Sequence, residues 1–186
     1  MEVSFWLFFY KVLSSYIPWI KHNSPLSKKN SWKTLSASAI SRDKGWPKPM
    51  EMTRLQIKKI IQKFRNTAIR ANRINFDCLE IHMAHGYLLH QFFSPISNKR
   101  NDIYGGTLEN RCRFLLEIAK QIANICKNKK IILGARITGK DWLKGGVDLK
   151  DSIYLSNKLK KLGFDYICVS SGGIKTTTNL MENQKL

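Results

Sequence analysis

The sequence lacks the features that would mark a membrane-spanning or disulfide-stabilised protein. It contains no run of about 18 apolar residues, the length that a transmembrane helix requires. Its four cysteines lie far apart, and none forms a Cys-x-x-Cys pair. This spacing argues against a zinc ribbon, a redox-active dithiol and a disulfide scaffold. Scattered free cysteines are typical of a reducing compartment, so we expect a cytoplasmic protein.

Acidic residues are also scarce: 13 Asp and Glu stand against 32 Lys and Arg, which gives a formal net charge of +19. Such an excess suggests a polyanionic partner, either nucleic acid or an anionic membrane. However, lysine greatly outnumbers arginine, the better reader of phosphates and bases, and the lysines are spread along the chain. We therefore favour a compositional origin and expect no nucleic-acid or membrane partner, with a basic interaction protein as an alternative.

The chain of 186 residues is 43% hydrophobic, which is enough for the core of one domain. Residues 1–17 form an apolar, aromatic leader without the positive start or Ala-x-Ala site of a signal peptide, and we expect it to lie outside the fold. Residues 18–52, rich in Ser, Lys, Asn and Pro, predict a long loop. The folded part is expected over residues 53–174, with a polar tail over 175–186.

Helical and extended patterns alternate within the folded part. Thr53 and Gln56 form a capping box before an apolar repeat of helical spacing, and Thr107 and Asp148 can cap two further helices. Strands are predicted at residues 78–81, 131–137 and 166–169. Because these runs are largely continuous in apolar residues, we expect a parallel α/β sheet that is covered by helices.

Polar side chains follow or end each predicted strand. They are His82 and His85 for the first strand, Arg136 and Thr138 for the second, and Ser170 and Ser171 for the third. The carboxyl ends of parallel strands meet at one edge of a sheet, where α/β proteins place ligands and catalytic groups. We therefore expect these side chains to share a site.

The segment 80–98, EIHMAHGYLLHQFFSPISN, carries the strongest sign of chemistry. The imidazole N–H groups of His82 and His85 could hold one substrate oxygen, and the Tyr87 phenol could donate a proton beside it. A third histidine, His90, raises the alternative of a zinc site. No Glu or Cys falls at ligand spacing with the three histidines, so we expect no metal.

Three stretches of the chain resemble the NADH:flavin oxidoreductase family, also called the old yellow enzyme family. They read FDCLEIHMAHGYLLHQFFSPISNKRNDIYGGTLENRCRF, GARITGKDWLKGG and FDYICVSSGGI, within a resemblance that covers about residues 18–174. The HGYLLHQFFSP form is similar to the bacterial ene-reductase branch, which has two substrate histidines. The resemblance implies a (β/α)8 TIM barrel with FMN over the C-terminal ends of its strands. This chain would hold a partial barrel of about strands 4 to 6 with their helices.

The resemblance also implies a reaction. NADH or NADPH would reduce the FMN, and hydride would then pass to the β-carbon of an activated alkene. His82 and His85 would bind the substrate oxygen, and Tyr87 would be the catalytic proton donor to the α-carbon.

Three further residues match the family's cofactor contacts. Arg136 matches an arginine near the flavin pyrimidine edge, and Ser171 and Gly172 match a loop that approaches the ribityl chain or phosphate. A second family signature runs from Arg100 to Arg113, and we interpret its residues as scaffold that ties a loop to a helix.

A whole barrel needs about 250 residues, more than this chain has. The resemblance implies that strands 1 to 3 and the last two strands carry further FMN contacts. We therefore expect two open sheet edges and an unburied apolar interior, which a complementing barrel half or a second copy of the chain would cover. The alternative is a truncated, catalytically dead remnant that binds no flavin.

Overall fold

The computed structural model describes residues 4–6, 33–129 and 131–175. Four parallel strands form one sheet in the order β1 (Ser4–Trp6), β4 (Cys78–Met83), β5 (Ile132–Thr138) and β6 (Tyr166–Ser170). A separate parallel pair joins β2 (Leu35–Ser36) to β3 (Met50–Glu51). Across the described ranges, no helix is both long and apolar enough to cross a membrane.

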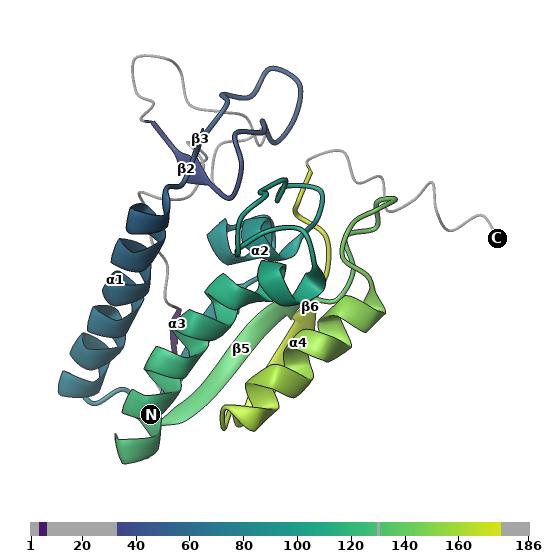
Figure 1. Ribbon diagram of the computed structural model, residues 1–186. Coiled ribbons are helices and arrows are strands. Elements are labelled where there is room, and N and C mark those ends of the chain that lie inside the picture. Colours follow the sequence, from purple (N-terminus) through teal and green to yellow (C-terminus); the bar gives the residue numbers. More distant parts are fainter. Residues whose placement is uncertain (1–3, 7–32, 130, 176–186) are drawn as a thin grey trace.

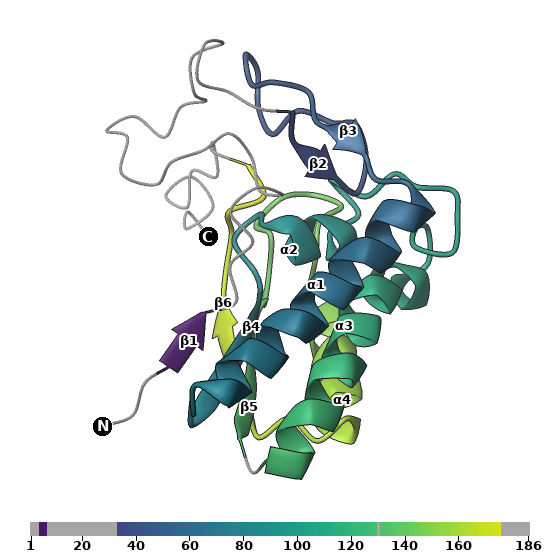
Figure 2. The ribbon, with the colours of Figure 1, turned by 90° about the vertical axis from the view of Figure 1, so that its left-hand side faces the viewer.

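Three long helices pack on one side of the four-stranded sheet (Figure 1): α1 (Arg54–Arg73), α3 (Leu108–Lys129) and α4 (Leu149–Lys161). Figure 2 shows the same layering from the side, with the short helix α2 (Leu88–Phe93) near the loops that follow the strands. Leu79 and Ile81 of β4 and Leu133 and Ala135 of β5 are at most 1% exposed and belong to one core with the helices. The core therefore lies between the sheet and its helices, as the strand–helix–strand pattern predicts.

The helix starts follow from local sequence signals. Thr53 Oγ1 accepts the Gln56 N–H at 3.2 Å and Gln56 Oε1 accepts the Thr53 N–H at 2.8 Å, which closes the predicted capping box of α1. Asp148 Oδ1 accepts the Asp151 N–H at 3.1 Å at the start of α4. Thr107 accepts a backbone N–H in the same way before α3. The three predicted caps are confirmed.

The face of the sheet opposite the helices carries polar side chains beside apolar ones, so it is less apolar than we expected. Side chains alternate along a strand, and Glu80 and His82 of β4 therefore share this inner face with Arg136 of β5 and Tyr166 of β6. The Tyr166 hydroxyl donates to Glu80 Oε2 at 3.1 Å. The strand between them has Gly134 at this level, where a Cβ would collide with the Tyr166 ring.

The structure describes parts of two segments that we expected to lie outside the regular fold, the leader and the 18–52 loop. Ser4–Trp6, which we placed in a leader outside the fold, pairs with Cys78–Glu80 at the edge of the sheet. The other leader residues, and most of the tail predicted over 175–186, lie outside the described residues. The described part of the 18–52 loop contains β2 and β3. Apart from β1, the division stays a prediction.

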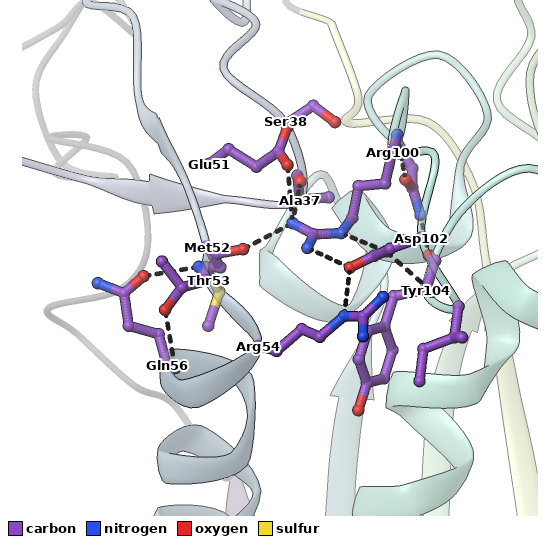
Figure 3. A network of polar contacts seen from close by, with 12 residues as sticks. Ala37, Ser38, Glu51, Met52, Thr53, Arg54, Gln56, Arg100, Asp102 and Tyr104 are labelled. Atoms are coloured by element: carbon purple, nitrogen blue, oxygen red, sulfur yellow. Dashed lines mark hydrogen bonds and ion pairs between the residues drawn. The ribbon is translucent and has the colours of Figure 1, made fainter.

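Arg100 joins the loop before α1 to the loop before α3 (Figure 3). Its Nη1 donates to the carbonyl oxygens of Ala37 at 3.0 Å and Met52 at 2.7 Å. Its Nε and Nη2 donate to the Asp102 carboxylate at 3.0 and 2.8 Å. The hydrogen bond from Arg100 is the main reason that the pKa of Asp102 is lowered to about 2. The scaffold interpretation is therefore confirmed for Arg100.

Candidate active site

The turn after β4 brings three aromatic side chains together. His82 lies within β4, and His85 and Tyr87 follow in the turn that leads into α2. The ring centroid of His82 lies 5.0 Å from that of His85 and 4.9 Å from that of Tyr87, and both pairs meet edge to face. The side chains that the sequence predicted to act together are thus neighbours in the structure.

Two consecutive residues of this turn adopt the left-handed backbone conformation. The φ angles are +58° at His85 and +74° at Gly86. This conformation costs a residue with a side chain about 1–2 kcal/mol. A Cβ on Gly86 would collide with the Gly173 carbonyl, and a Cβ on Gly173 would lie 2.5 Å from His85 Cα. The two glycines therefore permit the turn after β4 to touch the loop after β6.

His82 is a neutral hydrogen-bond donor. It is only 6% exposed. Burial lowers the pKa of His82 to about 3, and the nearby His85 and Arg136 lower it further. Its Nδ1 accepts the Ala84 N–H at 3.1 Å. A neutral imidazole that accepts at Nδ1 carries its proton at Nε2, so Nε2 is the donor of this ring.

Ser170, the last residue of β6, holds the ring of His85. The distance from Ser170 Oγ to His85 Nε2 is 2.5 Å, and the His85 backbone N–H donates to Thr138 Oγ1 at 3.3 Å. Burial, followed by the charge of Arg136, lowers the pKa of His85, which favours the neutral ring. When the Ser170 hydroxyl donates to Nε2, the ring proton resides on Nδ1, which becomes the donor of His85.

Arg136 stands beside His82 on the inner face. The strand register pairs it with His82 on one side and with Cys168 on the other. Its Nε donates to Glu80 Oε1 at 2.9 Å, and 22% of its side chain is exposed. The Glu80 carboxylate therefore fixes the guanidinium next to the histidine cluster.

The other two predicted cofactor residues flank the same sheet edge. Ser171 and Gly172 directly follow β6, and the Ser171 side chain is exposed. Gly172 has a φ of +71°, and its N–H donates to the Lys140 carbonyl at 3.1 Å. Gly172 thus uses its N–H within the protein, and its lack of a side chain lets a ligand approach the backbone closely. A fixed guanidinium, an exposed hydroxyl and a glycine loop at the C-terminal edge of a parallel sheet fit one side of an FMN.

A cavity opens beside the turn. His85 and Tyr87 line one side of it, and Ile40, Trp46 and Pro49 from the preceding loop line another. Polar and charged residues, among them Arg42, Gln91 and Lys175, line the rest of it, so the cavity offers both apolar surface and hydrogen-bonding groups to a small molecule. We did not predict these loop residues, because a loop carries no periodic pattern that would show which of its side chains face a site.

Two buried ionisable residues, His90 and Asp141, lie next to the turn. His90 Nε2 is 2.9 Å from Asp141 Oδ1, and neither side chain has any exposure. Burial opposes the charged form of Asp141, but the contacts with His90, Ser94 and the Val147 N–H outweigh it, and the pKa of Asp141 is lowered. Within the described part of the chain, no three His, Cys, Asp or Glu side chains gather as a metal-binding group. The sequence singled out His90 only as an alternative zinc ligand, and Asp141 not at all.

The comparisons with known proteins agree with the predicted family. Residues 22–181 match the model of the NADH:flavin oxidoreductase / NADH oxidase family. The chain is 41% identical to an NADPH dehydrogenase of Listeria innocua over 140 residues, which is 75% of this chain and 40% of that protein. An NADPH dehydrogenase of Halalkalibacterium halodurans is 44% identical over the same shares of the two chains.

Solved structures share the fold. Morphinone reductase in complex with tetrahydroNAD is 28% identical, with a TM-score of 0.66 over 74% of this chain and 42% of that one. A 2-naphthoyl-CoA reductase complex is 29% identical, with a TM-score of 0.71 over 75% of this chain and 21% of that one. The partial (β/α)8 barrel predicted from the sequence is therefore confirmed, and the names of the family and of these relatives agree with the predicted FMN and NADH or NADPH.

The chain spans 40% of the length of the curated relatives it matches, and the family match covers most of its residues. The sheet, the histidine turn and the matched residues all point to the same lineage. The chain belongs to the NADH:flavin oxidoreductase / NADH oxidase family.

Proposed function

We propose that the protein is an FMN-dependent oxidoreductase of the old yellow enzyme type, which transfers hydride from NADH or NADPH to an activated alkene. The observation that carries this proposal is the cluster of His82, His85 and Tyr87, whose rings meet at 5.0 and 4.9 Å and two of which, His85 and Tyr87, line a cavity. Relatives named NADPH dehydrogenase and morphinone reductase support a nicotinamide reductant and a small-molecule substrate.

His82 and His85 would bind the carbonyl or nitro oxygen of the alkene. Both rings are neutral, so each can donate one N–H without placing a charge on the substrate before it reacts. Negative charge grows on this oxygen as the β-carbon accepts hydride. Fixed donors stabilise that charge in the transition state more than in the ground state. Loss of one such donor typically slows catalysis by about 10²–10³-fold.

Tyr87 would donate a proton to the α-carbon. Its ring lies edge to face with His82 and borders the cavity, so its hydroxyl belongs to the same site. The β-carbon gains a hydride and the α-carbon gains a proton, which together convert the double bond to a single bond. A positioned acid of this kind typically contributes about 10²–10⁴-fold to the rate.

When bound, FMN would supply the redox chemistry by taking two electrons from NADH or NADPH and releasing them as a hydride. Arg136 would face the pyrimidine edge of the flavin, where a fixed cation favours electron-rich states of the ring. Ser171 and Gly172 would lie along the ribityl chain or phosphate. These assignments follow the family resemblance and the position of the three residues at one sheet edge.

Full activity would also need cover for the inner face of the sheet. Tyr166 and Ile132 on this face are 37% and 46% exposed. We propose that a complementing barrel half, or a second copy of this chain, covers it. Elution as a species larger than a monomer on a sizing column would support this association, and a monomer that retains flavin would contradict it.

Flavin retention is the first test of the proposed function. The purified full chain is incubated with FMN, separated from free flavin on a sizing column, and examined by visible spectroscopy. A retained and perturbed flavin band, with NADPH-dependent reduction of cyclohex-2-enone that Tyr87→Phe and His82→Ala impair, is the expected result. A compact chain that retains no flavin, either as a monomer or in a larger assembly, would overturn the proposal and favour the catalytically dead remnant. Salt-sensitive DNA binding would instead favour the basic interaction protein.

A further inference from the structure

The turn that carries His85 and Tyr87 must be held in place by its surroundings. Left-handed backbone at His85 is unfavourable in an isolated peptide. Gln91 Nε2 donates to the Gly86 carbonyl at 2.7 Å, and Thr138 Oγ1 accepts the His85 N–H at 3.3 Å. The Gly86 N–H donates to the side chain of His90 at 2.8 Å. Of these three side chains, only His90 is itself held by a buried charge.

His90 lies in α2 and binds the turn through its Nδ1. Because Nδ1 accepts the Gly86 N–H, the ring proton must reside on Nε2, the nitrogen that faces Asp141 Oδ1 at 2.9 Å. The side chain of His90 is 0% exposed, so no water can replace either contact. The Gly86 N–H thus sets the site of the ring proton. Asp141 Oδ1 lies at ion-pair distance from Nε2 without the alignment of a hydrogen bond, and Thr138 Oγ1 lies 3.4 Å from Nδ1.

Asp141 lies in the loop after β5 and is fixed in turn by other groups. Its Oδ2 accepts the Ser94 hydroxyl at 2.6 Å and the Val147 N–H at 2.8 Å. Ser94 is the C-terminal cap of α2, so Asp141 binds both His90 and the end of the helix that bears it. A buried carboxylate with three partners is a costly feature for a core, since apolar residues could fill the same space.

We propose that His90, oriented by Asp141, is a positioning residue that sets the turn of His85, Gly86 and Tyr87 by accepting the Gly86 N–H. This inference rests on the proposed function, because it gives the turn a role in presenting the two side chains to substrate. It assigns His90 neither to a metal nor to contact with substrate.

Two substitutions of His90 separate positioning from simple core packing. The amide oxygen of Asn reaches about as far as imidazole Nδ1, so His90→Asn can still accept the Gly86 N–H. The amide of Gln reaches about as far as Nε2, so His90→Gln can still contact Asp141 but leaves the Gly86 N–H without its acceptor. Both variants remove the ring, and a role in packing alone would make them equally defective.

The first readout needs no turnover. Amide hydrogen exchange of Gly86, measured by NMR on the full chain, should be at least about tenfold faster in His90→Gln than in His90→Asn, since the variant loses one buried hydrogen bond. The second readout is the reduction of cyclohex-2-enone by NADPH with added FMN, where His90→Gln should show a higher KM and a lower kcat than His90→Asn. Equal exchange rates at Gly86 in the two variants would overturn the proposal.

Asp141→Asn is an independent test that keeps the volume of the side chain. Its amide oxygen would accept from Ser94 and Val147, so its NH2 group would face His90 Nε2 and disfavour a proton there. We expect the ¹⁵N shifts of His90 to move from the Nε2–H to the Nδ1–H tautomer, with faster exchange at Gly86. An unchanged tautomer, or loss of folding in all three variants, would assign the pair to the core alone and overturn the proposal.

The two proposals can fail separately. If no form of the chain reduces the enone, the proposed function fails, while Gly86 exchange and the His90 tautomer still decide the role of His90. If the unmodified chain is active and both His90 variants match each other in exchange and kinetics, only the positioning role fails.

Discussion

Ser170 Oγ and His85 Nε2 lie 2.5 Å apart, which joins the end of β6 to the turn after β4. In the sheet, β4 and β6 are separated by β5. The Ser170 hydroxyl therefore fixes the orientation of the His85 ring, and when it donates to Nε2 the ring proton lies on Nδ1, which can then donate to a substrate. The arrangement of His85 depends on the sheet as a whole and not on the histidine segment alone.

Ser170→Ala should weaken substrate binding more than it slows the chemistry. The variant removes the partner of His85 Nε2, so the ring is free to change its tautomer and orientation. We expect the KM for cyclohex-2-enone to rise by about 5–10-fold, the loss typical of one hydrogen bond, with a smaller change in kcat. Ser156→Ala is the control, because this α4 hydroxyl donates only to the Ser152 carbonyl on the helix. Equal kinetics in the two variants would contradict the role given to Ser170.

Gly173→Ala should destabilise the protein by more than the cost of its backbone conformation. Gly173 has a φ of +88°, and its Cβ would lie 2.5 Å from His85 Cα and 2.6 Å from His85 C. Gly163 is the matched control, since it has a φ of +86° and nothing within 4 Å of its Cβ position. Gly163→Ala should lower Tm by roughly 2–8 °C, for a cost of about 1–2 kcal/mol. Thermal unfolding should show a larger drop for Gly173→Ala, and equal values would exclude the clash.

Local signals explain which parts of the fold could be predicted from the sequence. The caps at Thr53, Thr107 and Asp148 are each read within four residues, and each begins a helix in the structure. The histidine turn is likewise contained in one segment of the chain. Its residues could therefore be grouped from their spacing in the sequence alone.

Contacts between distant segments explain what the sequence did not predict. In β4, Glu80 and His82 alternate with Leu79 and Ile81, but a run that short is difficult to distinguish from a continuously apolar strand. The polar side chains of the inner face were overlooked for this reason. The pairing of His90 with Asp141 joins α2 to the loop after β5, and no local pattern links the two positions.

The ion pair between Arg100 and Asp102 should make stability sensitive to strong acid. The pKa of Asp102 is lowered from 3.8 to about 2, mainly by the hydrogen bond from Arg100. Its stabilising effect is thus present above about pH 4 and is lost as the pH falls towards 2. Since the carboxylate is partly exposed, we expect a contribution of about 1–2 kcal/mol.

The test measures the free energy of unfolding by urea between pH 4 and pH 2, for Asp102→Asn and for the unmodified chain. The variant should lose less of its free energy of unfolding over this range, because Asn does not titrate. Glu109→Gln, a change at an exposed position on α3, is the control and should follow the unmodified chain. A variant with the full acid sensitivity would show that other carboxylates account for it.

Acidification should lower the free energy of unfolding through His82 at a higher pH than through Asp102. Burial lowers the pKa of His82 from 6.5 to about 3. Between these two pH values, His82 is protonated in the unfolded chain and neutral in the folded chain. Stability is therefore highest above pH 6.5 and falls as the pH drops, by about 1.4 kcal/mol per pH unit from this group alone. His82→Gln removes the titrating group, so its loss of unfolding free energy between pH 7 and pH 4 should be smaller by up to about 3 kcal/mol. Ser156→Ala, treated in parallel, should keep the original pH dependence. The same slope in all three proteins would show that His82 titrates at the same pH in the folded and the unfolded chain, and would contradict its lowered pKa.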